Sequence, residues 1–135
     1  MSDCIFCKII NKEIPSYVVY EDERVMAFLD IMPISPGHVI VVPKSHVASL
    51  EDLSDGDFCT MTAVLKKIGK AVIESLGVKG YSLTLDNKAA ANQRIPHVHF
   101  HLVPRKEGDG LKKWPPGFYQ DGEAEDVLKK VKAKL

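Results

Sequence analysis

Apolar positions along the chain recur with two different periods, one typical of helices and one typical of strands. Residues 5–10 and 54–76 place them three and four positions apart, which predicts a short N-terminal helix and one long amphipathic helix. Ser54, with Asp57 three residues later, resembles a capping box, and Gly77 suits the end of the long helix.

Other segments are rich in β-branched and aromatic residues, and the last two of them alternate with period two. They predict strands near residues 17–21, 24–30, 38–43, 81–86 and 97–103. The order of helix, hairpin, strand, long helix and two strands favours an α+β fold over a βαβ array. We expect an antiparallel sheet of about five strands with the helices on one side.

The length of 135 residues is that of one domain, so we expect a single domain over residues 1–135. A C-terminal extension begins at about residue 106 with a loop rich in Gly and Pro. Its last part, residues 123–135, has acids first, lysines last and apolar residues at helical spacing, which indicates a final helix.

The 18 basic and 18 acidic residues balance, so no overall field attracts nucleic acid or an anionic membrane surface. We therefore expect no nucleic acid and no membrane as partners, and an anionic ligand must be held by a local site.

The N-terminus lacks the apolar core of a signal peptide, and no apolar run is long enough to span a bilayer. A cytoplasmic protein is the simplest interpretation. Three cysteines then favour metal binding, redox chemistry or burial over a disulfide framework.

Three of the five histidines, His97, His99 and His101, stand at alternate positions of a predicted strand. Alternate side chains share one face of a strand, so these imidazoles should be about 6.5 to 7 Å apart at the backbone. The spacing suits a row of imidazoles along a phosphate, two imidazoles that converge on a metal, or a solvated polar face. A neutral imidazole is also a nucleophile toward phosphorus, and a neighbouring histidine can assist the leaving atom.

Two cysteines, Cys4 and Cys7, lie three positions apart on the first predicted helix and form half of a tetrahedral zinc site. The sequence has no second pair of this kind, so histidines are the candidates for the other ligands. A redox pair is the alternative, but it usually follows a strand of a βαβ unit. Asp30, at a strand end, suits either a turn cap or a ligand for two ribose hydroxyls.

The stretch "HVHFHLVPR" resembles the signature of the histidine triad superfamily. Three more stretches resemble segments of the Hint branch of this family in the same order: "CIFCKIINKEIPS", "VYEDERVMAFLDIMPISPGHVIVVPKSH" and "WPPG". The resemblance covers roughly residues 4–118. It implies a HIT-like fold and a nucleotidyl hydrolase or transferase that proceeds through a nucleotidyl-histidine.

Carried over position by position, the resemblance makes His99 the nucleophile and places His101 at the phosphate or the leaving group. Gln93 is expected to hydrogen-bond to the same groups. The loop "DNKAAANQ" resembles the phosphate loop of the family, and its first two residues, Asp86 and Asn87, are expected to contact the substrate.

The same match implies that Asp30 binds the ribose hydroxyls of a purine nucleotide, an AMP or GMP moiety. Apolar residues are expected to line the pocket of the base: Ile5, Phe6, Ile9, Phe28 and Ile31.

The phosphate loop departs from the pattern of the family. Lys88 and Asn92 stand where glycines are usual, Asp86 replaces an amide, and Arg94 stands where a small hydroxyl residue is common. Asn tolerates a positive φ, so the backbone at position 92 can keep its conformation. The carboxylate costs phosphate binding unless it points away or pairs with a cation, whereas Lys88 can add a positive charge beside the phosphate.

The resemblance also implies a structural zinc, one ion per chain, because many prokaryotic members have a Cys2His2 site. Its ligands are expected to be Cys4, Cys7, His46 and His97. Such a saturated site leaves no open position for catalysis. Cys59, on the long helix, is expected to be a buried thiol, and His38 to be structural.

The sequence therefore predicts a hydrolase of purine nucleoside 5'-phosphoramidates or acyl-nucleotides, which releases the nucleoside monophosphate through a covalent intermediate. One alternative is a diadenosine polyphosphate hydrolase. Another is a nucleotide-binding, zinc-stabilised interaction module with little turnover. The resemblance to the Hint branch also implies a homodimer, with which the apolar stripe of the long helix is compatible.

Overall fold

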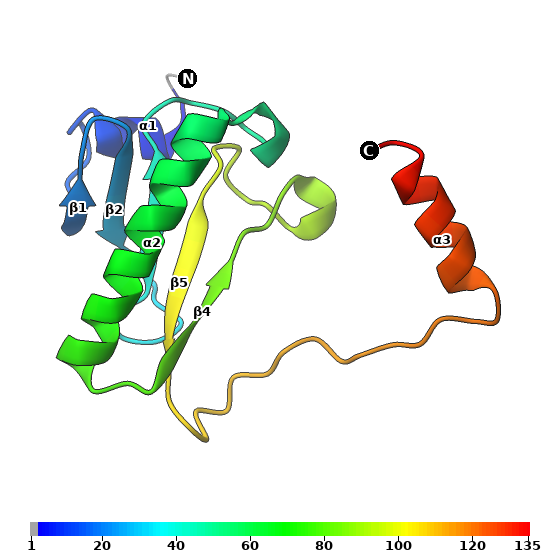
Figure 1. The fold of residues 1–135 in the computed structure, drawn as a ribbon. Coiled ribbons are helices and arrows are strands. Elements are labelled where there is room, and N and C mark those ends of the chain that lie inside the picture. Colours follow the sequence, from blue (N-terminus) through cyan, green and yellow to red (C-terminus); the bar gives the residue numbers. More distant parts are fainter. Residues whose placement is uncertain (1–2) are drawn as a thin grey trace.

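A computed structural model describes residues 3–135 (Figure 1). The strands are β1 (Val18–Glu21), β2 (Val25–Leu29), β3 (Val39–Pro43), β4 (Gly80–Thr84) and β5 (Phe100–Arg105). The α-helices are α1 (Ile5–Ile10), α2 (Asp55–Leu76) and α3 (Glu123–Lys132), and short 3-10 helices lie at η1 (Leu50–Asp52) and η2 (Ala89–Ala91).

The strands form one antiparallel sheet in the order β1-β2-β3-β5-β4. This confirms the predicted α+β fold. β3 is buried along its whole length and pairs with β2 on one side and β5 on the other. In the second pairing Ile40 lies directly opposite His101. Because opposite residues of a pair share a face, alternate residues of β3 point to the same side as the histidines.

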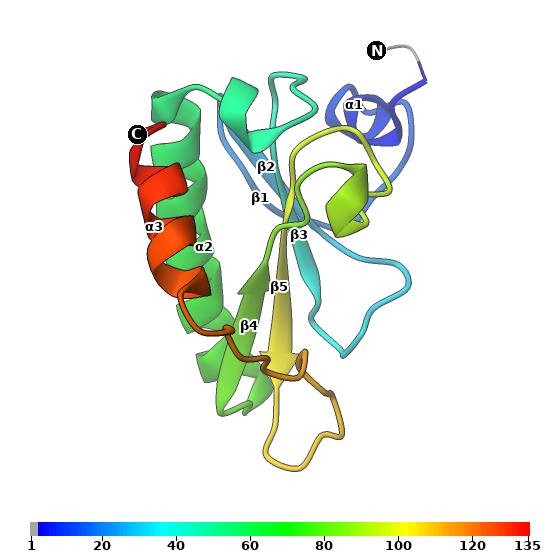
Figure 2. The same ribbon diagram turned by 90° about the vertical axis from the view of Figure 1, so that its right-hand side faces the viewer.

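α2 packs on one face of the sheet (Figure 2). Its apolar stripe, which includes Leu65 and Ile68, forms the main core with alternate residues of β2 and β3 such as Ala27 and Val41. The helix begins at Ser54, whose Oγ accepts a hydrogen bond from the Asp57 N–H at 3.1 Å. It ends at Gly77, whose φ of 65° is the left-handed conformation that glycine favours. Both predicted ends of the helix are confirmed.

α1 lies on the opposite face, where Phe6 and Ile9 pack against Met26, Phe28 and Ile40. The expectation that the helices share one side was therefore wrong. β2 and β3 have apolar, buried residues at consecutive positions, so both of their faces need a cover. On this face Phe6 of α1 also lies against the rings of His97 and His99, with centroids 5.9 and 5.0 Å away.

Two smaller expectations also need correction. β5 begins at Phe100, so His97 and His99 precede the strand, although the Val98 N–H still donates to the Val47 carbonyl at 2.8 Å. The Cys59 thiol is exposed rather than buried, because the core stripe of α2 runs through Met61 and Leu65 and leaves position 59 outside.

The chain after β5 forms an extended C-terminal arm, residues 106–135, which carries α3. Figure 1 shows α3 beyond β4, apart from the other elements, and in the turned view of Figure 2 it lies in front of α2. The predicted final helix is confirmed, and none of its residues is buried. Across residues 3–135, no helix has both the length and the apolar character needed to cross a bilayer.

Candidate active site and metal centre

A cavity of about 660 Å³ opens on the α1 side of the sheet. Its volume lies within the usual range for small-molecule sites. The structure brings ten of the predicted substrate and catalytic residues into its lining: Ile5, Phe6, Ile9, Phe28, Asp30, Ile31, Asp86, Gln93, His99 and His101. Apolar residues from α1 and β2 form one part of the wall, and polar residues from the loop before β5 form another. The cavity therefore suits a ligand with one apolar and one polar end.

The structure brings the four predicted metal ligands together in one cluster. Their donor atoms all lie within 4.8 Å of one another. Cys7 Sγ is 3.2 Å from His46 Nδ1 and 3.6 Å from His97 Nδ1. The two Nδ1 atoms are 3.2 Å apart, and Cys4 Sγ is 3.5 Å from His97 Nδ1. Ligands of a tetrahedral zinc are about 3.3 to 3.8 Å apart for the usual Zn–N and Zn–S bond lengths, so this donor set fits zinc.

The orientation of His97 also fits a metal ligand. Its Nε2 lies 2.8 Å from the Pro43 carbonyl oxygen. A carbonyl can only accept, so Nε2 holds the proton and Nδ1 presents its lone pair to the two sulfurs. The four ligands thus come from α1 and the residue before it, from the loop after β3, and from the segment before β5.

His99 is held with its reactive nitrogen toward the cavity. Its Nδ1 lies 2.8 Å from the His97 carbonyl oxygen, so Nδ1–H donates and Nε2 carries the lone pair. Phe6 packs edge-on against the ring, with the two centroids 5.0 Å apart. The buried imidazole is therefore fixed in one tautomer and one orientation.

His101 is fixed by a histidine from the loop before β3. The Ile34 N–H donates to His38 Nδ1 at 3.1 Å, which leaves the proton of His38 on Nε2. That Nε2–H then donates to His101 Nδ1 at 2.8 Å. His101 in turn keeps its proton on Nε2. His99 therefore presents a lone pair on Nε2, and the adjacent His101 presents an N–H donor at its own Nε2. The two ring centroids are 4.9 Å apart.

The sequence interpretation missed this role of His38, which it took as structural only. Strand alternation contained the signal, because His38 lies two positions before Ile40 and Ile40 pairs with His101. Finding it required the register of β3 against β5, which the sequence does not supply.

Asp30 has the turn-cap role that its sequence position suggested, and it also lines the cavity. Its Oδ1 accepts from the Met32 N–H at 2.8 Å, as a turn cap does. Its Oδ2 lies 3.8 Å from His38 Nε2, and the residue lines the cavity. One carboxylate oxygen thus holds the turn while the other is directed to the histidine side of the pocket.

Burial keeps the site imidazoles neutral. It lowers the pKa of His99, and it lowers the pKa of His101 to about 4, with a further contribution from the neighbouring His99 and His38. The negative charges of Asp86 and Asp30 act in the opposite sense on both residues. The neutral form therefore prevails at pH 7, and the Nε2 lone pair of His99 remains available.

Gln93 lines the cavity, but its amide is used to brace the loop. Its Oε1 accepts from the Lys88 N–H at 2.6 Å, and its Nε2 donates to the carbonyls of Ala48 at 2.8 Å and Ile95 at 3.0 Å. Both amide protons are therefore occupied. Only a lone pair of Oε1 remains for a donor on the substrate, so this geometry supports positioning of the loop more directly than the predicted contact with phosphate.

Asn87 and Lys88 are not among the residues that line the cavity, and their side chains bind η1. Asn87 Oδ1 accepts from the Leu50 N–H, and its Nδ2 donates to Glu51, both at 2.8 Å. Lys88 Nζ lies 3.2 Å from Glu51 Oε1. These bonds lower the pKa of Glu51 to about 2. Both ends of the Asn87 amide fasten the loop to η1, so the predicted contact of Asn87 with substrate stays a prediction that would require these bonds to change. The ammonium group of Lys88 is paired with Glu51.

Two of the unusual loop residues, Asn92 and Lys88, adopt a positive φ where the family usually has glycine, and the other two line the cavity. Asn92 has a φ of 70° and a ψ of 28°, the left-handed conformation that asparagine tolerates. Lys88 has a φ of 73° and a ψ of 164°, a region essentially restricted to glycine. Asp86 and Arg94 both line the cavity.

Comparison with known proteins gives this arrangement a family. The sequence matches the model of the HIT domain over residues 11–108. It is 46% identical over 130 residues to an uncharacterized HIT-like protein of Methanocaldococcus jannaschii, covering 96% of this chain and 98% of that protein. It is 38% identical over 143 residues to an adenosine 5'-monophosphoramidase of Candida albicans, covering 99% and 94% of the two chains.

Solved structures agree. A HIT family protein from Bacillus subtilis superposes with a TM-score of 0.90 at 33% identity, covering 98% of this chain and 97% of that one. The arm makes up 30 of the 135 residues, so a score this high requires the arm to superpose as well. A Zn-bound histidine triad family protein from Mycobacterium smegmatis gives a TM-score of 0.79 at 31% identity, covering 99% of both chains.

Proposed function

Because the chain belongs to the HIT domain family, we propose that it is a nucleotidyl hydrolase that cleaves purine nucleoside 5'-phosphoramidates or acyl-nucleotides. The observation that carries the proposal is the fixed tautomer of His99, which directs the Nε2 lone pair into a cavity of nucleotide size. The relative from Candida albicans, whose name states adenosine 5'-monophosphoramidase activity, supports this substrate class.

The reaction takes two displacements at phosphorus. His99 Nε2 attacks the α-phosphorus of the phosphoramidate, the P–N bond to the leaving amine breaks, and its electron pair goes to the amine, which takes a proton from water. The Nδ1–H bond to the His97 carbonyl stabilises the positive imidazole ring of the intermediate. Water then attacks the phosphorus, the bond to Nε2 breaks, and the nucleoside monophosphate leaves as a proton returns to solvent.

His101 serves both displacements as a hydrogen-bond donor. Its Nε2–H, fixed by His38, lies beside the nucleophile and can donate to an oxygen of the phosphoryl group or to the leaving atom. A preorganised donor of this kind stabilises charge that develops in the transition state without reorganisation during the reaction.

The nucleoside occupies the apolar part of the cavity. The base packs among the side chains of α1 and β2, including Phe6 and Phe28, and Asp30 Oδ2 accepts hydrogen bonds from the ribose hydroxyls. Asp86 and Arg94 lie at the polar end and place charge near the leaving group.

We assign one structural zinc per chain to Cys4, Cys7, His46 and His97, supported by the donor distances and the Zn-bound relative. When bound, the ion supplies a fixed link between α1 and the segment before β5 that carries His97 and His99. Thiolate ligands of this kind suit the reducing cytoplasm, where we place the protein. We also propose that the whole chain is one HIT domain with a C-terminal extension, and that it forms a homodimer.

Trapping the intermediate tests the mechanism. The reaction with adenosine 5'-phosphoramidate is stopped after a few seconds, and the protein is digested without exposure to acid. Mass spectrometry of the wild type should then show an AMP adduct on the peptide that contains His99. The variant His99→Ala should show no adduct, and its kcat/KM should fall at least a thousandfold. Arg94→Gln, altered at an exposed lining residue, should still form the adduct. Full turnover by His99→Ala would overturn the covalent mechanism.

A further inference from the structure

The loop between β2 and β3, residues 30–38, carries His38 and forms part of the cavity wall. Several of its hydrogen bonds are internal. The His38 N–H donates to the Ser35 carbonyl at 3.0 Å, and the Ile34 N–H donates to His38 Nδ1 at 3.1 Å. These bonds fix the shape of the turn, but they do not fix its position relative to β5, which carries His101.

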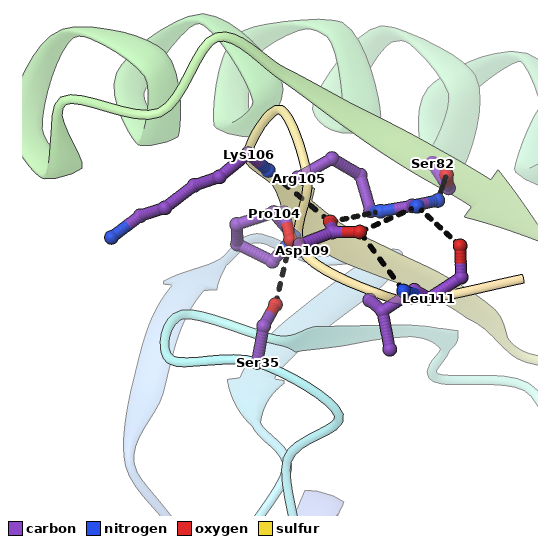
Figure 3. Close-up of polar contacts among 7 residues, drawn as sticks. All are labelled: Ser35, Ser82, Pro104, Arg105, Lys106, Asp109 and Leu111. Carbon is purple, nitrogen blue, oxygen red and sulfur yellow. Dashed lines mark hydrogen bonds and ion pairs between the residues drawn. The ribbon is translucent and has the colours of Figure 1, made fainter.

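A hydroxyl group joins this loop to β5. Figure 3 shows Ser35, whose Oγ donates to the Pro104 carbonyl at 2.7 Å. Val39 of β3 lies opposite Leu102 of β5, so in the same register the position opposite Pro104 is Gly37. β3 begins only at Val39, and the Pro104 carbonyl therefore has no strand partner on this side. The Ser35 hydroxyl satisfies it in place of a backbone amide.

The acceptor of this bond lies in a part of β5 that is firmly held. Arg105 follows Pro104, and its guanidinium group is surrounded by acceptors (Figure 3). It donates from Nε and Nη2 to the two oxygens of Asp109 at 2.7 and 3.1 Å. Its Nη1 donates to Ser82 Oγ on β4 at 3.0 Å, and its Nη2 donates to the Leu111 carbonyl at 3.1 Å. The Pro104 carbonyl is thus a fixed reference point for the loop.

Packing alone does not hold the turn on every side. A Cβ at Gly37 would overlap Leu76 Cδ1 and come within 3.2 Å of Pro104 Cγ, so the turn is closely packed there. Beside it lies a second cavity of about 230 Å³, whose lining includes Ser35 and Pro36. Since no side chain of residues 3–135 fills this space, the hydrogen bond of Ser35 is what holds the turn against it.

We propose that Ser35 is a positioning residue of the active site, which through its bond to Pro104 keeps His38 at the distance where it donates to His101. Within residues 3–135, two side-chain hydrogen bonds join this loop to β5: the one from Ser35 to Pro104 and the one from His38 to His101. The donors are three residues apart on the loop, and the acceptors are three residues apart on β5. Loss of the first bond therefore lets the turn move and weakens the second.

The consequence is a change in the tautomer of His101. Without the donor from His38, the His101 ring exchanges its proton between its two nitrogens and no longer presents a fixed N–H to the cavity. The effect on the rate rests on the proposed hydrolase function. The tautomer itself is a property of the protein without substrate, so it can be measured independently of that function.

Nitrogen NMR of the full chain with 15N-labelled histidine tests the position of His38. At pH 7.5, well above the pKa of about 4 of His101, the wild type should show two well-separated ring signals for this residue. In Ser35→Ala the two signals should move toward each other, and in Ser35→Thr, which keeps the hydroxyl, they should stay apart. The control is Ser82→Ala, which removes one acceptor of Arg105 in the same cluster and should match the wild type. Unchanged signals in Ser35→Ala, or equal shifts in the control, would overturn the proposal.

Turnover of adenosine 5'-phosphoramidate gives the second measurement. In Ser35→Ala kcat should fall about three- to tenfold, the range expected for one net hydrogen bond. The KM should stay within about twofold, because Asp30 keeps its own bond with the Met32 N–H. Ser35→Thr should recover most of kcat, and Ser82→Ala should stay within twofold of the wild type. Equal losses in the alanine and threonine variants would show that the hydroxyl is not responsible. A wild type with the fixed tautomer and no turnover would refute the hydrolase function alone.

Discussion

His38 sets the tautomer of His101: its Nε2–H donates to His101 Nδ1 at 2.8 Å, because its own Nδ1 already accepts from the Ile34 N–H. This chain of two hydrogen bonds begins at a backbone amide and ends at a donor N–H in the cavity. A neutral imidazole offers one donor and one acceptor, so the backbone determines which nitrogen of the second ring faces the substrate. His38 is thus a positioning residue rather than a catalytic one.

Removal of this donor should lower the rate without much effect on binding. For His38→Ala we expect kcat for adenosine 5'-phosphoramidate to fall about 10- to 100-fold, because His101 can then turn or take the other tautomer. The KM should stay within about threefold. His38→Gln keeps an N–H near the position of Nε2 and should restore most of kcat. Equal losses in both variants would contradict the tautomer role and leave only a packing role for His38.

Loss of the cysteine pair should remove the metal and loosen the active site. We expect Cys4→Ser/Cys7→Ser to lower the zinc content, measured by plasma emission, from about one per chain to nearly none. The melting temperature should fall, and kcat should fall as well, because α1 carries Phe6 against the ring of His99. Cys59→Ser, which changes an exposed thiol outside the cluster, is the control and should keep both zinc and activity. Full zinc in the double variant would refute the assigned ligands.

Because the pKa of His101 is lowered in the folded state, the free energy of unfolding should decrease in mild acid. Burial lowers its pKa in the folded state to about 4, whereas the unfolded state has the ordinary value near 6.5. Between these values the unfolded state binds more protons, so the free energy of unfolding decreases as the pH falls from about 6.5 to 4. Asp30 and Asp86 oppose the shift but do not cancel it.

Urea unfolding at several pH values measures this contribution. In His101→Gln the slope of the free energy of unfolding against pH should be shallower than in the wild type, by at most about 1.4 kcal/mol per pH unit. Contributions from the metal ligands are common to both proteins and cancel in the difference. Identical slopes would mean that His101 is not protected from protonation in the folded state.

Sequence patterns were sufficient for most of the elements, whereas most of the cavity residues were predicted from the resemblance to the Hint branch. The long helix begins and ends where Ser54 and Gly77 predict, because caps are local features. The alternation of His97, His99 and His101 with apolar residues placed the imidazoles on one face. The two CxxC sulfurs met His46 and His97 as the family resemblance implied.

The errors arose where the outcome depends on non-local packing. Nothing in the short stripe of α1 says which face of the sheet it covers. The hydrogen bonds that the amides of Asn87 and Gln93 make with η1 and with the Ala48 carbonyl are also non-local and were not predicted. His38 required the register of two strands. Side chains with several hydrogen-bonding groups therefore cannot be assigned to substrate until their protein partners are known.

Replacement of Lys88 by glycine should stabilise the loop, because the backbone at this position has a conformation that favours glycine. Its φ of 73° and ψ of 164° lie in a region that costs a residue with a Cβ about 1 to 3 kcal/mol. Lys88→Ala and Lys88→Gly both lose the exposed ion pair with Glu51, so comparison of the two isolates the backbone. We expect the glycine variant to be more stable by about 1 kcal/mol, measured by urea unfolding, although glycine usually lowers stability relative to alanine. At Lys79, an exposed position with no positive φ, the same pair of substitutions should show the usual order, with alanine the more stable. An alanine variant at least as stable as the glycine variant at position 88 would mean that the loop relaxes to another conformation, and that the lysine is tolerated without strain.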